Sequence, residues 1–102
     1  MFYNILKAKD LVDLDSAQKF ERKVLMENGQ SCLCIVALKK GEIIDTHTSD
    51  ANATALVLEG EIELHFEAEK FKLKKGEMLM FKKEDEHKVY GLSDSKFLLI
   101  KI

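Results

Sequence analysis

The chain has 102 residues, of which 46% are hydrophobic and 33% are charged, and its formal net charge at pH 7 is -2. This length and apolar content suit one domain over residues 1–102 with one core, because typical domains contain about 100–150 residues. The balanced charge excludes a basic field for a nucleic acid and a cationic face for a membrane.

Targeting signals are missing from the sequence pattern. The longest apolar run is only a few residues, far below the ~20 residues that a membrane span needs. The N-terminal residues M-F-Y-N-I-L-K lack the basic start and the long apolar stretch of a signal peptide. We therefore expect a cytoplasmic protein with no nucleic-acid or membrane partner.

The first nineteen residues have no clean periodicity. Residues 10–19 predict a loop or one short helical turn, for which Ser16 is a candidate cap. Residues 2–6 predict a strand, and two placements remain open for it: it joins a sheet edge of its own chain, or it joins the sheet of a partner.

The clearest local signal is the pair Asn28-Gly29 between two strand-like runs, 20–27 and 30–39. Both residues tolerate positive φ, so the pair predicts a β-hairpin. The second run contains S-C-L-C-I-V-A-L-K. Its apolar residues at successive positions predict a strand buried on both faces, either inside a sandwich or beneath a second subunit.

The remainder of the chain predicts further short strands separated by turns. Residues 61–67 alternate, with Ile62, Leu64 and Phe66 on one face and His65 among glutamates on a solvated face. Residues 78–81 are apolar on both faces. About eight or nine short strands, with turn signals every eight to twelve residues and almost no helix, predict a sandwich or barrel.

Cys32 and Cys34 are two positions apart, so they point the same way from a strand. Neighbours on one face of a strand form a disulfide with difficulty, because their side chains stand roughly parallel. A single C-x-C pair is a weak metal signal. We interpret both as small buried side chains in a reducing compartment.

A first spaced motif consists of Gly41, His47 and Gly60. It resembles the first motif of the cupin family, which runs Gly, five residues, His, one residue, His, three or four residues, Glu, six residues, Gly. Ser49 stands at the second His position and Ala53 at the Glu position.

A second motif supports the same resemblance. The family pattern is Gly, five residues, Pro, one residue, Gly, two residues, His. Gly76 and His87 match it, while Lys82 replaces the Pro and Glu84 replaces the second Gly. The resemblance implies an all-β fold, the double-stranded β-helix or jelly-roll barrel.

The resemblance also implies where a metal would bind. The family holds its metal with three His and one Glu, and the equivalent residues here are His47, Ser49, Ala53 and His87. Ala53 offers no ligand and Ser49 offers only a neutral hydroxyl. Two imidazoles fall short of the three ligands of a catalytic zinc site and of the two-His-one-carboxylate set of iron oxygenases.

Three interpretations of this site remain open. Asp45 lies two residues before His47, so on a regular strand it faces the same way and completes an iron, manganese or zinc triad with His87. Alternatively, His47 and His87 hold a divalent ion (Fe, Mn, Ni or Zn) loosely with waters. In the third interpretation the histidines bind no metal. They then hydrogen-bond within a polar barrel mouth, or they line a pocket for a small molecule such as an organic acid, with Ser49 and Asn52 as pocket residues.

The sequence therefore predicts a small barrel that binds a small-molecule ligand, with a weakly held metal or none and without strong catalysis. The alternative is a metal-dependent enzyme such as a dioxygenase, isomerase or lyase. We also expect a homodimer, because strands 31–39 and 77–81 are apolar on both faces and need covering.

Overall fold

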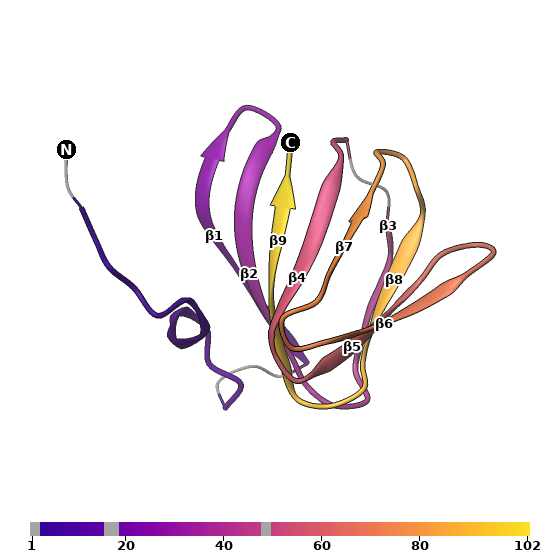
Figure 1. The fold of residues 1–102 in the computed structure, drawn as a ribbon, viewed down its shortest axis with the longest axis horizontal. Helices are drawn as coiled ribbons and strands as arrows, with labels where there is room; N and C mark the ends of the chain where they lie inside the picture. The colour runs from indigo at the N-terminus through magenta and orange to yellow at the C-terminus, as the bar shows by residue number, and fades with distance from the viewer. Residues whose placement is uncertain (1–2, 16–18, 48–49) are drawn as a thin grey trace.

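The computed structural model describes residues 3–15, 19–47 and 50–102. Within these residues, nine strands form two antiparallel sheets that face each other (Figure 1). A short 3-10 helix, η1 (Ala8–Leu11), precedes the strands. The strands are β1 (Phe20–Asn28), β2 (Ser31–Leu38), β3 (Ile43–His47), β4 (Ala53–Glu59), β5 (Glu61–His65), β6 (Lys70–Lys74), β7 (Met78–Phe81), β8 (His87–Gly91) and β9 (Ser95–Lys101).

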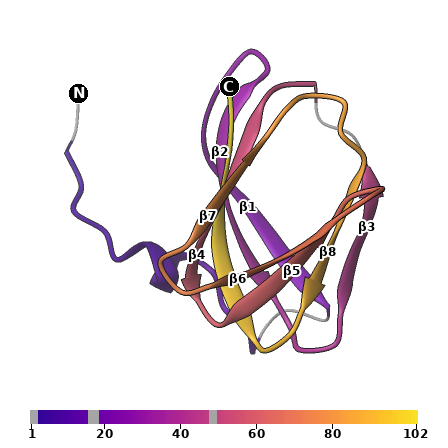
Figure 2. The same cartoon turned by 45° about the vertical axis from the view of Figure 1, so that its right-hand side comes forward.

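The strand order identifies the architecture. One sheet has the order β1-β2-β9-β4-β7 and the other β3-β8-β5-β6, so the chain passes repeatedly from one sheet to the other. The sheets lie close together at one end and further apart at the other (Figure 2). This arrangement confirms the predicted all-β jelly-roll fold. Within the described residues, no helix has the length and apolar character that crossing a membrane requires.

The main core fills the space between the sheets. Alternation along β5 puts Ile62 and Leu64 into it, where they pack with Val36 and Leu38 of β2 and Phe97 of β9. Each of these side chains is at most 2% exposed, and full burial of such a side chain contributes about 1.5–3 kcal/mol.

Strand β2 is buried on both faces, as predicted, and its own chain supplies the cover. Its inner residues join the main core, while Ile35 and Ala37 on the outer face pack against Val12. Leu11 and Leu14 flank this contact. The N-terminal segment thus takes the place of the second subunit that was the alternative cover for β2.

The N-terminal residues agree only in part with their prediction. The helical turn lies at 8–11 and overlaps the segment 10–19 only at its start, while residues 12–15 form a loop, the other predicted alternative. The predicted cap Ser16 lies outside the described residues. Residues 3–7 form no strand and extend away from the barrel (Figure 1).

Gly60 shows why a motif glycine is required in this fold. Its φ of +81° lies in the left-handed region, and an added Cβ would overlap the carbonyl oxygen of Asp94 and lie 2.6 Å from the Ser95 Oγ. Ser95 is fully buried, and its hydroxyl lies 3.0 Å from the Glu61 amide nitrogen, from which it accepts a hydrogen bond. Gly60 thus allows the β4–β5 turn to dock against β9.

We expect Gly60→Ala to lower the free energy of unfolding by about 3 kcal/mol, since left-handed strain of about 1–2 kcal/mol adds to a backbone overlap. Gly29→Ala is the matched control, because Gly29 also has positive φ but an added Cβ there meets nothing within 4 Å. It should cost about 1 kcal/mol. Urea unfolding of both variants measures the difference, and equal losses would contradict the docking role of Gly60.

Candidate functional site

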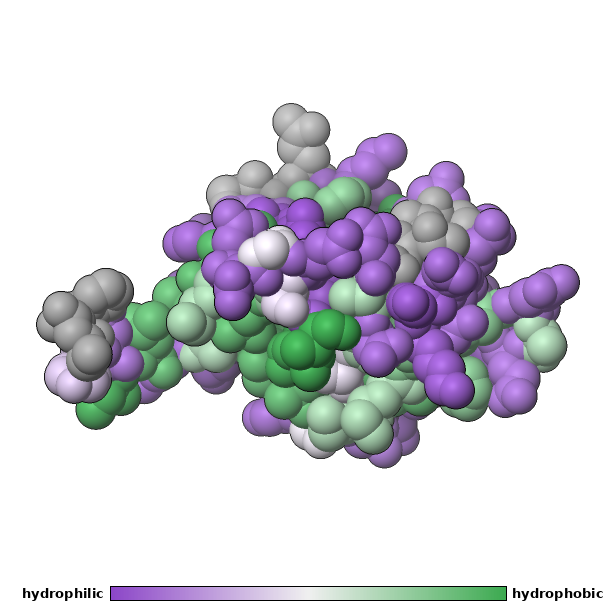
Figure 3. All heavy atoms as spheres, turned by 90° about the horizontal axis from the view of Figure 1, so that it is seen from above, coloured by the Kyte–Doolittle hydropathy of each residue, from purple (hydrophilic) through white to green (hydrophobic). Residues whose placement is uncertain are grey.

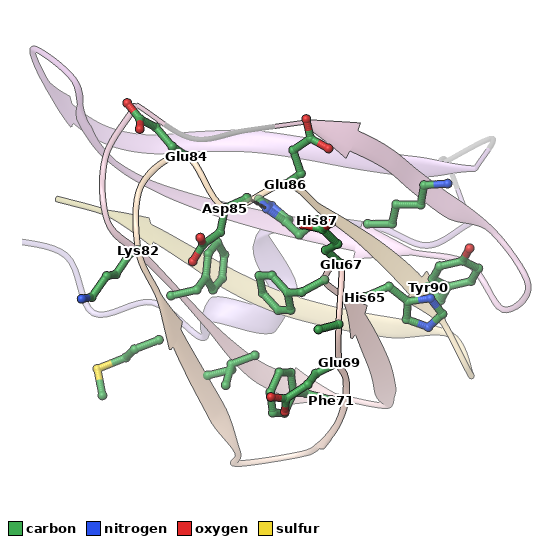
Figure 4. A pocket seen from close by; sticks show the side chains of 16 residues that line it. His65, Glu67, Glu69, Phe71, Lys82, Glu84, Asp85, Glu86, His87 and Tyr90 are labelled. Atoms are coloured by element: carbon green, nitrogen blue, oxygen red, sulfur yellow. Dashed lines mark hydrogen bonds between the residues drawn. The ribbon is translucent and has the colours of Figure 1, made fainter.

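A cavity of about 1120 Å³ opens to solvent between the loop joining β5 to β6 and the end of β7. The start of β8 and the β7–β8 loop complete its walls (Figure 4). Both loops connect strands of the jelly roll, so the fold itself brings these segments together. The cavity combines an aromatic interior with a charged rim.

The aromatic interior is centred on Phe66. Its ring centroid lies 5.9 Å from that of Phe71 and 5.4 Å from that of Phe81, both in edge-to-face geometry. The His87 ring lies 5.8 Å from Phe66 and 4.8 Å from Phe81. Edge-to-face contacts of this kind contribute about 0.5–1.5 kcal/mol beyond area burial, so the four rings hold one another in place.

His87 is the first residue of β8 and is only 4% exposed. Its Nδ1 lies 2.9 Å from the carbonyl oxygen of Asp85. A carbonyl only accepts, so Nδ1 carries a proton and donates it to this bond. In the neutral ring Nε2 is then the acceptor nitrogen. One hydrogen bond and two ring contacts therefore fix the orientation of this imidazole.

The prediction that His65 is solvated is wrong. Its ring stacks on Tyr90 at 3.9 Å between centroids with an interplanar angle of 24°, and its Nε2 lies 2.5 Å from the Glu63 Oε1. The side chain is 18% exposed and lines the cavity. The alternating pattern of β5 did place His65 on the outer face. What sequence reasoning missed is that β8 pairs with β5 and brings Tyr90 opposite Glu63.

The rim of the cavity is acidic. Five carboxylates and two ammonium groups line it, and all but one of these seven side chains are exposed. The carboxylates belong to Glu67, Glu69, Glu84, Asp85 and Glu86, and the ammonium groups to Lys82 and Lys88. The carboxylates outnumber the ammonium groups by three, so this acidic rim gives the cavity a negative electrostatic potential.

The predicted metal ligands do not all come together. His47 and His87 are register partners on β3 and β8, so their Cα atoms lie opposite each other. The register shifts between Ile44 and His47, which breaks the two-residue periodicity that would align Asp45 with His47. The Asp45 side chain is 88% exposed and its Oδ1 lies 3.9 Å from the Lys88 Nζ. The structure therefore does not bring Asp45 to the buried His87.

The two predicted pocket residues have different outcomes. Ser49 lies outside the described residues. Asn52 is not among the residues that line the cavity. Its side-chain oxygen accepts a hydrogen bond of 3.2 Å from the Lys83 amide, and its carbonyl accepts one of 2.8 Å from the Ile102 amide. Asn52 thus ties the β7–β8 loop, which walls the cavity, to the C-terminus.

A metal site with three or more ligands is not found among the described side chains. In residues 3–15, 19–45 and 50–102, no three His, Cys, Asp or Glu side chains lie close enough to hold a metal. Ala53, at the position of the family's Glu, is 5% exposed within β4. A site with three or four protein ligands is therefore not formed by these residues.

The two thiols lie beside each other without a disulfide. Their Sγ atoms are 3.6 Å apart, and the Arg22 Nη2 lies 3.3 Å from the Cys34 Sγ. Burial, and secondarily the hydrogen bond with Cys32, raise the pKa of the Cys34 thiol. Cys34 is the small buried side chain that was predicted, whereas Cys32 is half-buried. A raised pKa disfavours the thiolate, so Cys34 is poorly suited to act as a nucleophile.

Known structures share this fold. A conserved protein of unknown function from Streptococcus pyogenes matches with a TM-score of 0.90 and 19% identity over 100% of this chain and 89% of that chain. A cupin superfamily protein from Desulfitobacterium hafniense matches with a TM-score of 0.89 and 19% identity, over 100% of this chain and 93% of that chain. A cupin 2 conserved barrel domain protein from Leptotrichia buccalis matches with a TM-score of 0.83 and 27% identity, over 92% of this chain and 45% of that chain.

Sequence comparison gives the family. No curated protein matches the chain in sequence. The sequence model described as "Cupin domain" matches residues 34–102, which is more than half of the chain and includes both motifs. The chain belongs to the cupin family.

Proposed function

We propose that this protein is a cupin that binds a small organic molecule in the cavity beside His87, without strong catalysis of its own. The observation that carries the proposal is the cavity itself. It joins an aromatic interior around Phe66 to a polar rim and is open to solvent. Small-molecule sites are typically cavities of about 300–1,000 Å³ with mostly apolar walls and a few fixed polar groups.

His87 is the fixed polar group of this proposed site. Its ring is held by the Asp85 carbonyl and by Phe81, so its orientation is set before a ligand arrives. Preorganised groups of this kind reduce the ordering cost of binding. The alternative from the sequence, a metal-dependent enzyme, needs a third protein ligand beside His47 and His87, and the Asp45 side chain is exposed near Lys88.

A loosely held divalent ion is the second candidate, and one observation favours it. His47 and His87 are register partners in adjacent antiparallel strands, so their backbones lie opposite each other. Two imidazoles with waters form a weak site for iron, manganese, nickel or zinc.

We also propose that the protein forms a homodimer through its N-terminal arm, defined as residues 3–7. Tyr3 is 87%, Ile5 104% and Leu6 61% exposed, and the arm projects from the barrel with hydrophobic residues on its surface (Figure 3). Apolar side chains on an extended, unpaired segment favour burial against a second copy. Strand β1, at the edge of its sheet, offers exposed Val24 and Met26.

For ligand binding, we expect fragments identified by NMR screening to shift the amide resonances of Phe66, Phe81 and His87. Phe66→Leu should weaken such fragments about tenfold, because an aromatic contact of about 1.4 kcal/mol is lost. The matched control is Phe20→Leu, since Phe20 lies on β1 and does not line the cavity. Fragments that bind elsewhere, or whose affinity is unchanged by Phe66→Leu, would contradict the proposed site.

For metal binding, we expect protein purified without chelator to carry iron, manganese, nickel or zinc well below one equivalent by elemental analysis. Titration with Zn²⁺ should then show weak binding that His47→Ala and His87→Ala each abolish. The control is His65→Ala, because the His65 ring is held by Glu63 and Tyr90 instead. A near-stoichiometric metal that disappears in the His47 variant would favour the enzyme.

For assembly, we expect a dimer at micromolar concentration by light scattering after gel filtration. The double variant Ile5→Asp with Leu6→Asp should raise the dimer dissociation constant at least tenfold, since each buried side chain contributes about 1.5–3 kcal/mol. Asn4→Asp places a charge on the same arm at a polar position and should leave the dimer intact. A monomeric unmodified protein would contradict the proposal.

A further inference from the structure

The charge around the cavity constrains what can enter it. The acidic rim contributes five carboxylates against two ammonium groups. Lys88 lies within 3.9 Å of Asp45, so part of its charge is balanced outside the cavity. In Figure 4, Glu84 and Glu86 lie at the rim and point away from His87, as does Lys82. Carboxylates gathered around an apolar cavity raise the local concentration of cations and lower that of anions.

The interior adds a second, independent preference. Phe66, Phe71 and Phe81 present aromatic rings to the cavity. The faces of such rings are electron-rich and attract cations, most strongly where water is excluded. An alkylammonium group therefore gains from the rings as well as from the rim.

His87 offers little to attract an anion through its Nδ1–H, because that group already donates to the Asp85 carbonyl. The described lining of the cavity combines aromatic rings and carboxylates.

We propose that the ligand of this cavity is an organic cation, with an alkylated or primary ammonium group placed against Phe66 and Phe71 and balanced by the acidic rim. The inference rests on the proposed function, since it names the chemical class of ligand for the same site. It replaces the organic acid that was one alternative from the sequence.

Three probes of the same shape and different charge test the inference: choline, its neutral isostere 3,3-dimethylbutan-1-ol, and the anion 3,3-dimethylbutanoate. Titration of the full chain, followed through the amide resonances of Phe66, Phe71 and His87, gives an affinity for each. We expect choline to bind about tenfold more tightly than the neutral isostere and the anion to bind most weakly. Added salt should reduce the difference in affinity between choline and the neutral isostere, because salt screens the exposed rim carboxylates.

Matched variants separate the two sources of selectivity. Glu67→Gln with Glu69→Gln should lower choline affinity about fivefold at low salt and leave the neutral isostere within about twofold. Glu21→Gln with Glu27→Gln removes the same charge from β1, away from the cavity, and should change neither. Phe66→Leu should remove most of the remaining preference for choline over the neutral isostere.

The outcomes distinguish this inference from the proposed function. If the neutral or anionic probe binds the cavity as tightly as choline, the cation inference is overturned and small-molecule binding stands. If neither the three probes nor the screened fragments shift cavity resonances, both fail. The cation inference would also be overturned if the Glu67/Glu69 variant and the Glu21/Glu27 variant lowered choline affinity equally. Such a result would mean that net charge acts over the whole molecule and not at the rim.

Discussion

The pairing of β3 with β8 is the constraint on which the site depends. It sets His47 opposite His87, and the register shift just before His47 leaves Asp45 on the outer face near Lys88. A regular strand would have put a carboxylate and an imidazole on one face. One irregularity in the backbone therefore separates Asp45 from His87, so the three-ligand site expected from a regular strand is not formed with Asp45.

The residues around His87 give this site its apolar character. Ala53 stands where the family pattern has its Glu, and it is the register partner of Phe81 in the neighbouring strand. The Phe81 ring lies 4.8 Å from that of His87 and 5.4 Å from that of Phe66. Ala53 and Phe81 thus put a methyl group and an aromatic ring at neighbouring strand positions, and the Phe81 ring packs against the imidazole. The contacts of His87 include these rings and the Asp85 carbonyl.

The sequence predicted those features that depend on local pattern. The Asn28-Gly29 hairpin forms as expected, alternation along β5 buries Ile62 and Leu64, and the two motifs gave the jelly roll. The predictions that were wrong concern contacts between neighbouring strands. Stacking of Tyr90 on His65 and the displacement of Asp45 both depend on which residue of β8 lies opposite which residue of its neighbours. Such register is non-local, and one extra residue in a strand changes it.

The charge of the proposed ligand depends on whether the site holds a metal ion. A divalent ion is usually the largest local charge in its site and reverses the effect of surrounding carboxylates, so that anionic groups can be bound. Where the rim alone sets the field, its carboxylates outnumber its ammonium groups by three. That field, together with the rings of Phe66 and Phe71, is the basis for the organic cation that we propose as the ligand.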